Sequence, residues 1–299
     1  MTMQRKNVLA VSTADRLLNV AIYVIMFITG VLTVYPFINI LALSLNDAND
    51  AMRGGIYLWP RVFTLRNYAE VFRYNGLLLS FEISVARTVI GTAASVLSTG
   101  MLSYALSRKD FSGRKVITVL FIVTMYAYGG IIPEYLVIKM LGLYNNFLVY
   151  ILPGLIGVFY ILLIRTFITS LGPSIQESAM IDGANDLVIF FRIIFPLCSP
   201  VIATVALYCA VGQWNSWFDT YLYTDGETLS TLQFQMVKIL QQTTLNRTAA
   251  HIDASSAPKV SPEAIRMTIT IIATIPILVV YPFLQKYFVK GMTIGAIKS

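Results

Sequence analysis

The run from Gln213 to Asp219 holds the side chains of this sequence best suited to binding a polyhydroxylated molecule. It reads Gln-Trp-Asn-Ser-Trp-Phe-Asp and lies within a long apolar stretch. Amide groups donate and accept hydrogen bonds with hydroxyl groups, and an aromatic face packs against the apolar side of a sugar ring. We therefore take four residues as candidate substrate contacts: Gln213, Trp214, Asn215 and Trp217. Anchoring at a membrane surface explains Trp217 nearly as well.

Arg87 lies inside another apolar stretch, where a charge is costly and marks a functional candidate. Glu82 is five residues earlier, a spacing that does not place both side chains on one helix face, so an ion pair between them is not expected. Two interpretations of Arg87 stay open. It contacts an acidic sugar, or it reaches the membrane surface or pairs with a neighbouring subunit.

A third apolar stretch carries Tyr126 and Tyr128, followed by Gly129, Gly130 and Pro133. Glycine and proline can loosen a helix beside a cavity, so the two tyrosines are further candidates for the substrate path. A simple packing kink explains the same residues.

The sequence holds no set of residues for catalysis or metal binding. The phosphate-binding pattern G-x-x-x-x-G-K-[ST] does not occur, and there is one histidine, His251. Cys198 and Cys209 lie about 16 Å apart along one apparent helix, too far for a disulfide. We expect no catalytic residue, no metal and no cofactor in this chain, and no enzymatic activity.

These candidates depend on a membrane setting, which the composition indicates. Hydrophobic residues make up 57% of the 299-residue chain and charged residues 12%, against about a quarter charged in soluble domains. A bilayer span needs about 20 apolar residues. The sequence predicts an all-α polytopic membrane protein with six transmembrane helices in a single domain, 1–299. The predicted spans are 17–45, 77–107, 115–139, 146–170, 200–224 and 265–288.

The Lys and Arg residues predict the orientation in the membrane. They gather in the N-terminus, in the connection Arg108–Lys115 and in the C-terminus, which share one side if there are six spans. Cytoplasmic segments carry such an excess, so we expect both termini in the cytoplasm and the connections 46–76 and 225–264 outside. Topology then explains the net charge of +7 better than nucleic-acid binding does.

The cytoplasmic connection 171–199 contains a predicted short helix. Ser174 and Glu177 have the spacing of a capping box at a helix start, and Gly183 is suited to ending the helix. Small residues leave room for another backbone, while Met180 and Ile181 offer apolar contacts, so the helix suits a groove on a partner. A helix tucked under the membrane bundle explains the spacing equally well.

A resemblance to a known family favours the first interpretation. Glu177-Ser178-Ala179, Gly183, Ile193 and Pro196 are similar to the signature loop of ABC-importer permeases, E-A-A, three residues, G, nine residues, I-x-L-P. Ser178 replaces the second Ala of that motif, and Phe195 replaces its Leu. In the family this loop is a coupling helix that docks into a groove of the ATPase subunit. The resemblance implies ATPase coupling for six residues: Glu177, Ser178, Ala179, Asp182, Gly183 and Ala184.

The resemblance covers most of the chain and narrows the family. Residues 104–108, Tyr-Ala-Leu-Ser-Arg, and the C-terminal run 282–291 are similar to carbohydrate permeases of the maltose-importer second-subunit type, with a type I ABC importer core. The long connection from Asp225 to Glu263 resembles the branch that imports oligosaccharides of complex polysaccharides, including uronate-containing ones such as alginate.

The resemblance implies a multi-pass permease of a bacterial cytoplasmic (inner) membrane that moves oligosaccharides, acidic ones included, by alternating access. The implied partners are a homologous permease subunit in a heterodimer, two ATP-binding cassette subunits that hold ATP and magnesium, an extracytoplasmic sugar-binding protein and lipid, but no nucleic acid. Import of a neutral oligosaccharide or polyol is the alternative. A stand-alone secondary transporter is a more distant one, because it would need intramembrane carboxylates.

Overall fold

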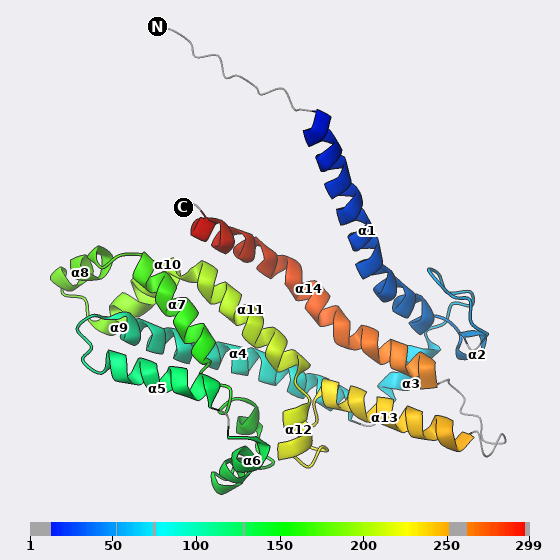
Figure 1. The fold of residues 1–299 in the computed structure, drawn as a ribbon. Coiled ribbons are helices and arrows are strands. Elements are labelled where there is room, and N and C mark those ends of the chain that lie inside the picture. Colours follow the sequence, from blue (N-terminus) through cyan, green and yellow to red (C-terminus); the bar gives the residue numbers. More distant parts are fainter. Residues whose placement is uncertain (1–12, 52, 74–75, 128, 251–261, 297–299) are drawn as a thin grey trace. The chain divides into compact units, whose positions relative to one another are not determined.

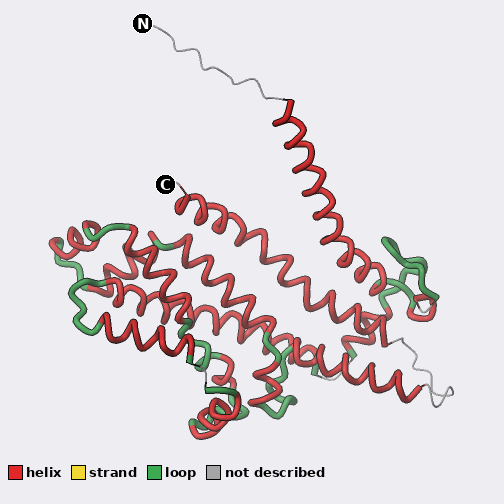
Figure 2. Tube along the Cα trace, viewed as in Figure 1, coloured by secondary structure: helices red, strands yellow, loops and turns green. Residues whose placement is uncertain are grey.

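A computed structural model describes residues 13–51, 53–73, 76–127, 129–250 and 262–296. Throughout these residues the regular structure is helical, with one isolated bridge between Asn46 and Phe63 and no named strand (Figure 2). The predicted all-α class is confirmed for this part of the chain. The chain divides into two compact units, one of residues 1–70 with 257–271 and the other of residues 71–256 with 272–299.

The first unit contains the long apolar helix α1 (Thr13–Ser44) and the short α2 (Ala48–Ala51). The 32 residues of α1 extend over about 48 Å, more than the roughly 30 Å of a hydrocarbon core. None of its most apolar window is buried, and such a surface requires an apolar environment such as lipid. Helix α3 (Arg66–Phe72) begins in this unit, where the Asn67 side chain donates to the carbonyls of Ser44 and Asn46 at 2.9 and 2.8 Å.

The second unit is built around α4 (Leu77–Ser107), beside which α5 (Arg114–Tyr126), α7 (Val158–Ser170) and α11 (Ser199–Asn215) lie (Figure 1). A stripe of small residues at helical spacing explains the close packing of α4, because small side chains allow helix backbones to approach. The buried members of that stripe include Ser84, Gly91, Ser95, Thr99, Gly100 and Ser103.

The other helices of this unit include one 3₁₀-helix, η1, and one π-helix, η2. They are α6 (Ile131–Met140), η1 (Phe147–Tyr150), α8 (Ser174–Ile181), α9 (Asp186–Val188), η2 (Ile189–Ile194), α10 (Phe195–Leu197), α12 (Phe218–Tyr223) and α13 (Leu232–Ala250). Helix α14 (Pro262–Ala296) contributes its beginning to the first unit and its remainder to the second.

Three helical stretches in the described residues are each long and apolar enough to cross a bilayer: Asp15–Ser44, Leu77–Ser107 and Glu263–Val280. Three bent helix pairs raise the number to six if each pair is one span. The three remaining predicted spans are not continuous helices, because polar and glycine residues interrupt them. Gly130, with a φ of 91°, precedes α6, residues 151–157 separate η1 from α7, and α11 ends at Asn215 before α12 starts at Phe218.

The connection 225–264 contains a helix that the sequence did not predict. Helix α13 has 19 residues and alternates glutamines with apolar residues without a clear apolar face. Its start is held by the second unit, since the backbone N–H of Leu232 donates to the Ser84 hydroxyl of α4 at 2.8 Å. Tertiary contacts, which a reading of local periodicity does not detect, thus support this helix.

Candidate functional site

Helix α8, the predicted coupling helix, lies at the end of the second unit where α4 and α7 also end (Figure 1). The capping box predicted for Ser174 and Glu177 is wrong, because the helix starts one residue earlier than that motif requires. Pro173 is the N-cap residue and no side chain caps the helix. Instead, the Pro173 carbonyl accepts the backbone N–H groups of both Gln176 and Glu177 at 3.0 Å.

Gly183 ends α8 as predicted, with a φ of 81° in the left-handed region. The N–H of Gly183 donates to the carbonyl of Met180, and the N–H of Ala184 donates to that of Ala179, both at 3.0 Å. This pair of bonds is the Schellman motif, which needs a left-handed residue after the helix. A Cβ at Gly183 would meet nothing within 4 Å, so the requirement for glycine here comes from the backbone.

The candidate coupling residues divide into an exposed set and a buried one. Glu177, Ser178, Asp182 and Gly183 are exposed. Ile181, an unusually open apolar residue, is 87% exposed. Ala179 is buried and Ala184 is partly buried, and both lie in the core cluster of the second unit. Ala179 and Ala184 therefore hold α8 against its own chain, while Glu177, Ser178 and Ile181 form the face that is open to a partner.

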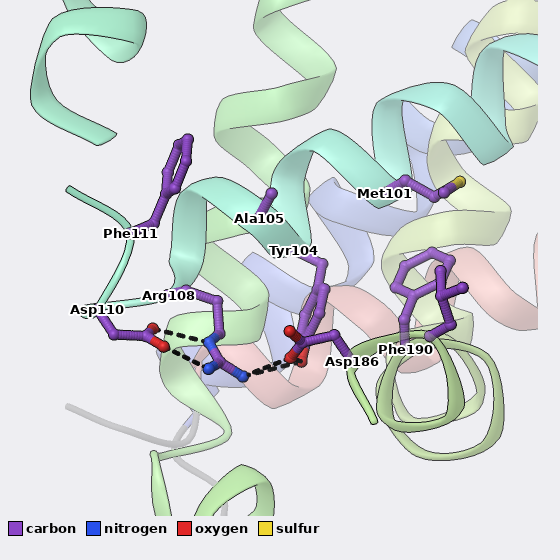
Figure 3. Close-up of a pocket in the computed structure, with 9 residues that line it drawn as sticks. Met101, Tyr104, Ala105, Arg108, Asp110, Phe111, Asp186 and Phe190 are labelled. Carbon is purple, nitrogen blue, oxygen red and sulfur yellow. Dashed lines mark hydrogen bonds and ion pairs between the residues drawn. The ribbon is translucent and has the colours of Figure 1, made fainter. Parts of the chain in front are cut away.

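Between the end of α4 and the helices α9 and η2 lies a pocket of about 380 Å³, whose polar wall is built around Arg108 (Figure 3). Arg108 directly follows α4, and its guanidinium lies between two carboxylates. Its Nη1 is 2.7 Å from Asp186 Oδ1, and its Nε and Nη2 are 2.8 and 2.5 Å from the Asp110 oxygens. Tyr104 donates its hydroxyl to Asp186 at 3.2 Å. The remaining lining residues are Met101, Ala105, Phe111, Leu187 and Phe190.

The ion pair between Arg108 and Asp110 shifts the pKa values of both groups. The hydrogen bonds from Arg108 lower the pKa of Asp110, and the same bonds raise the pKa of Arg108 above its usual value. Both shifts favour the ion pair. Together with Asp186, the cluster carries two negative charges and one positive, so it is suited to holding helix ends together rather than to proton transfer.

The second candidate region, the proposed substrate path, is centred on Arg87. This side chain is 2% exposed and paired within its own chain rather than with Glu82 or another subunit. Its Nη1 and Nη2 lie 3.1 and 2.5 Å from the two Asp219 oxygens, a bidentate ion pair. The guanidinium carbon is also 4.3 Å from the centre of the Tyr150 ring. Arg87 therefore joins α4 to α12 and η1.

Gln213 completes this cluster from α11. Its Oε1 accepts from Arg87 Nε and Nη2 at 3.0 and 2.9 Å, and its Nε2 donates to the Tyr150 carbonyl at 3.0 Å. Gly91 provides the space, because a Cβ at Gly91 would lie 2.8 Å from Gln213 Nε2. The hydrogen-bonding groups of Arg87 and Gln213 are thus used inside the protein in this conformation.

The other predicted contacts are more dispersed. Trp214 is buried and donates its indole N–H to the Ala273 carbonyl of α14 at 3.0 Å. Asn215 is exposed, and Trp217 is 37% exposed at the break between α11 and α12. Tyr126 is 82% exposed at the end of α5, and Tyr128 lies outside the described residues. The structure thus brings Arg87 and Gln213 together and leaves Asn215 and Trp217 with free surface.

Reasoning from sequence missed the residues that complete both clusters. Asp219 was noticed only as the end of its run, although it balances the charge of Arg87. Tyr150, Gly91, Asp186 and Asp110 carried no signal of their own. A charge inside an apolar stretch does require a partner, and a search for intramembrane carboxylates would have pointed to Asp219.

Comparisons with known proteins agree with the signature loop. No protein-family model matches the chain. The chain is 36% identical to the polygalacturonan/rhamnogalacturonan transport system permease protein YtcP of Bacillus subtilis (strain 168), over 95% of this chain and 99% of that protein. It is 38% identical to protein LplC of the same organism, over 92% of this chain and 93% of LplC.

A solved structure is similar along nearly the whole chain. It is that of a bacterial ABC transporter involved in the import of the acidic polysaccharide alginate, with a TM-score of 0.83 and 30% identity over 93% of this chain and 98% of the other. The apolar helices and these relatives define the class, a membrane-spanning permease subunit of an ABC transporter. The chain belongs to the family of carbohydrate ABC transporter permeases. In this family ATP hydrolysis is the task of a separate subunit.

Proposed function

We propose that this chain is the permease subunit of an ATP-driven importer that carries acidic oligosaccharides across the cytoplasmic membrane by alternating access. The observation that carries the choice of substrate is the agreement of two similar proteins. One is named for polygalacturonan and rhamnogalacturonan, the other for alginate. Polygalacturonan and alginate are polymers of uronic acids, so their fragments carry a carboxylate on every sugar.

The support for an acidic substrate comes from these relatives and not from Arg87. Asp219 neutralises Arg87, and Gln213 and Tyr150 occupy the rest of its surface. Asn215 and Trp217 have the free surface and the chemistry to contact a sugar at the α11–α12 break. We assign substrate contact to these two residues and a positioning role to Arg87 and Gln213.

The membrane topology is part of the proposal. Six spans are supported by the three long helices together with the helices α5–α6, α7 and α11 of the bent pairs, whose other members lie in the coupling segment. The distribution of Lys and Arg favours cytoplasmic termini. The chain then forms one permease domain, with the coupling segment 171–199 inside and the connection 225–264 outside.

Energy reaches this chain through α8. Its exposed face joins Ile181 to the polar residues Glu177 and Ser178 at one end of the second unit. Burying a side chain of the size of Ile181 in a partner groove contributes about 1.5–3 kcal/mol. The proposed assembly has a homologous permease subunit, two ATPase subunits carrying ATP and magnesium, and an extracytoplasmic sugar-binding protein. ATP must bias the equilibrium between inward- and outward-facing states for import to be directional.

Reconstitution of the complex in proteoliposomes with its binding protein tests this function. We expect ATP-dependent uptake of oligogalacturonate or alginate oligosaccharides, and little uptake of neutral oligosaccharides of the same length. The matched control is the carboxyl-reduced form of the same oligosaccharide, which keeps its length and linkage. Uptake of neutral sugars alone would overturn the choice of substrate, and uptake without ATP would overturn the importer.

A further inference from the structure

The segment that follows the coupling helix is attached to α4 through one guanidinium. Arg108 directly follows α4, and its side chain is 13% exposed even though both of its carboxylate partners are more than half exposed. Asp110 belongs to the same turn as Arg108, whereas Asp186 is 78 residues further along the chain. The bond to Asp186 therefore joins two segments, and the bond to Asp110 only orients the guanidinium.

The segment between α8 and Asp186 is short, and hydrogen bonds fix its geometry. The Schellman motif at Gly183 is followed by Asn185, whose side chain accepts the backbone N–H of Val188 at 2.9 Å and caps α9. Asp186 is the first residue of α9, and α9 continues directly into η2. Only four residues thus separate the end of α8 at Ile181 from Asp186, and defined hydrogen bonds fix their geometry.

The contact with α4 includes the residue one turn before Arg108. Tyr104 donates its hydroxyl to Asp186 Oδ1 and accepts from Arg108 Nη1 at 3.3 Å. The Tyr104 ring also lies 5.7 Å, centre to centre, from the ring of Phe190 in η2. Polar and apolar contacts therefore act at the same helix end, and Figure 3 shows the carboxylate of Asp186 directed at both side chains.

We propose that Arg108 is a positioning residue of the transport cycle, which ties the segment after the coupling helix to the end of α4 through Asp186. A displacement of α8 by the ATPase is then passed to α4, the helix that packs on α7 and α11 and carries Arg87. This inference rests on the proposed function. It adds a specific path from the docking surface to the membrane helices.

Two substitutions of matched chemistry test the path. Asp186→Asn and Asp110→Asn each remove one carboxylate from Arg108, and the two side chains are equally open, 68% and 67% exposed. Only Asp186→Asn removes charge from the bond between segments. In the reconstituted complex we expect it to lower the sugar imported per ATP hydrolysed by roughly fivefold or more, a typical size for coupling between sites. Asp110→Asn should change this ratio by less than about twofold.

Arg108→Gln should lower the same ratio, whereas Lys109→Gln removes the same charge one residue away and should not. Co-purification of the ATPase subunits reports whether each variant assembles. An unchanged ratio in both Asp186→Asn and Arg108→Gln would overturn the inference, as would an equal loss in Asp110→Asn. Loss of assembly in Asp186→Asn would also overturn it, because the residue would then serve folding.

Hydrogen exchange of the last turns of α4 gives a readout that needs no sugar. When the ATPase dimer is closed with ATP and vanadate, exchange of residues 100–107 should change in the wild-type complex and in Asp110→Asn. It should change much less in Asp186→Asn, and an equal response in all three would refute the path. Failure of the wild-type complex to import sugar would instead count against the proposed function, because this exchange measurement does not depend on the substrate.

Discussion

Removal of the Asp219 carboxylate should destabilise the protein more than removal of Arg87 itself. Arg87 is 2% exposed, whereas the Asp219 side chain is 22% exposed and can be hydrated when it is unpaired. Breaking a buried ion pair costs about 3–5 kcal/mol when the remaining charge stays buried. The partial exposure of Asp219 and the remaining contacts of Arg87 with Gln213 and Tyr150 place Asp219→Ala at the lower end, about 3 kcal/mol.

Arg87→Met keeps most of the apolar volume and leaves a carboxylate that water can reach. Its cost comes mainly from the unpaired Gln213 oxygen and should be about 1–2 kcal/mol. The double variant Arg87→Met/Asp219→Ala should be destabilised by no more than about 1–2 kcal/mol, as Arg87→Met is. The two single losses are then far from additive.

Equilibrium unfolding in mixed detergent micelles measures these differences, and the fluorescence of Trp214 and Trp217, which lie between Gln213 and Asp219 in the sequence, follows it. Gly154→Ala is a suitable control, since a Cβ there meets nothing within 4 Å and the residue has no positive φ. The reasoning would be refuted if Arg87→Met were the more costly single change. Additive losses in the double variant would refute it equally, because they would mean that the two side chains do not stabilise each other.

Two further predictions concern Gly183, after α8, and Asp225, after α12. Gly183→Ala should strain the left-handed residue after α8 by about 1–2 kcal/mol and weaken retention of the ATPase subunits on purification, while membrane insertion stays normal; unchanged retention would contradict the role of the Schellman motif. The backbone N–H of Glu227, with Asn145 and Thr228, lowers the pKa of Asp225. Because the folded pKa lies below the unfolded one, this stabilisation is complete above about pH 4 and is lost as the pH falls through the folded pKa. Asp225→Asn should show a smaller loss of stability than the wild type in unfolding titrations between about pH 5 and pH 3, and parallel curves would refute the assignment.

The class of the protein and the end of α8 could be predicted because both depend on local properties. A run of about 20 apolar residues needs lipid wherever it occurs in a chain. Gly183 follows a short polar helix, and a left-handed residue is required there by the helix end alone. The start of α8 depends on equally local features but was predicted wrongly. The Pro173 carbonyl accepts the backbone N–H of Glu177, which the capping box assigned to the side chain of Ser174.

The positions of the helix breaks could not be predicted from the sequence. Composition treats residues 146–170 as one apolar run, whereas the structure forms η1 and several turns before α7. The Tyr150 hydroxyl donates to the Leu229 carbonyl and forms a second hydrogen bond with the Thr220 hydroxyl. These bonds join η1 to segments far away in the sequence. Such breaks are stable because other parts of the chain satisfy the backbone and side-chain polar groups.

By itself, the sequence determined that this chain is a helical membrane protein, with a loop that resembles the coupling loop of ABC importers. Only the tertiary structure decided what its charged and polar side chains do. Arg87 suggested an acidic ligand, but 132 residues away Asp219 neutralises it. In the sequence, Arg108 served only to predict the orientation in the membrane. In the structure its bond to Asp186 joins the end of α4 to α9. The physical reason is that helix periodicity reports neighbours within two turns, whereas the partner of a charge depends on which helices pack together.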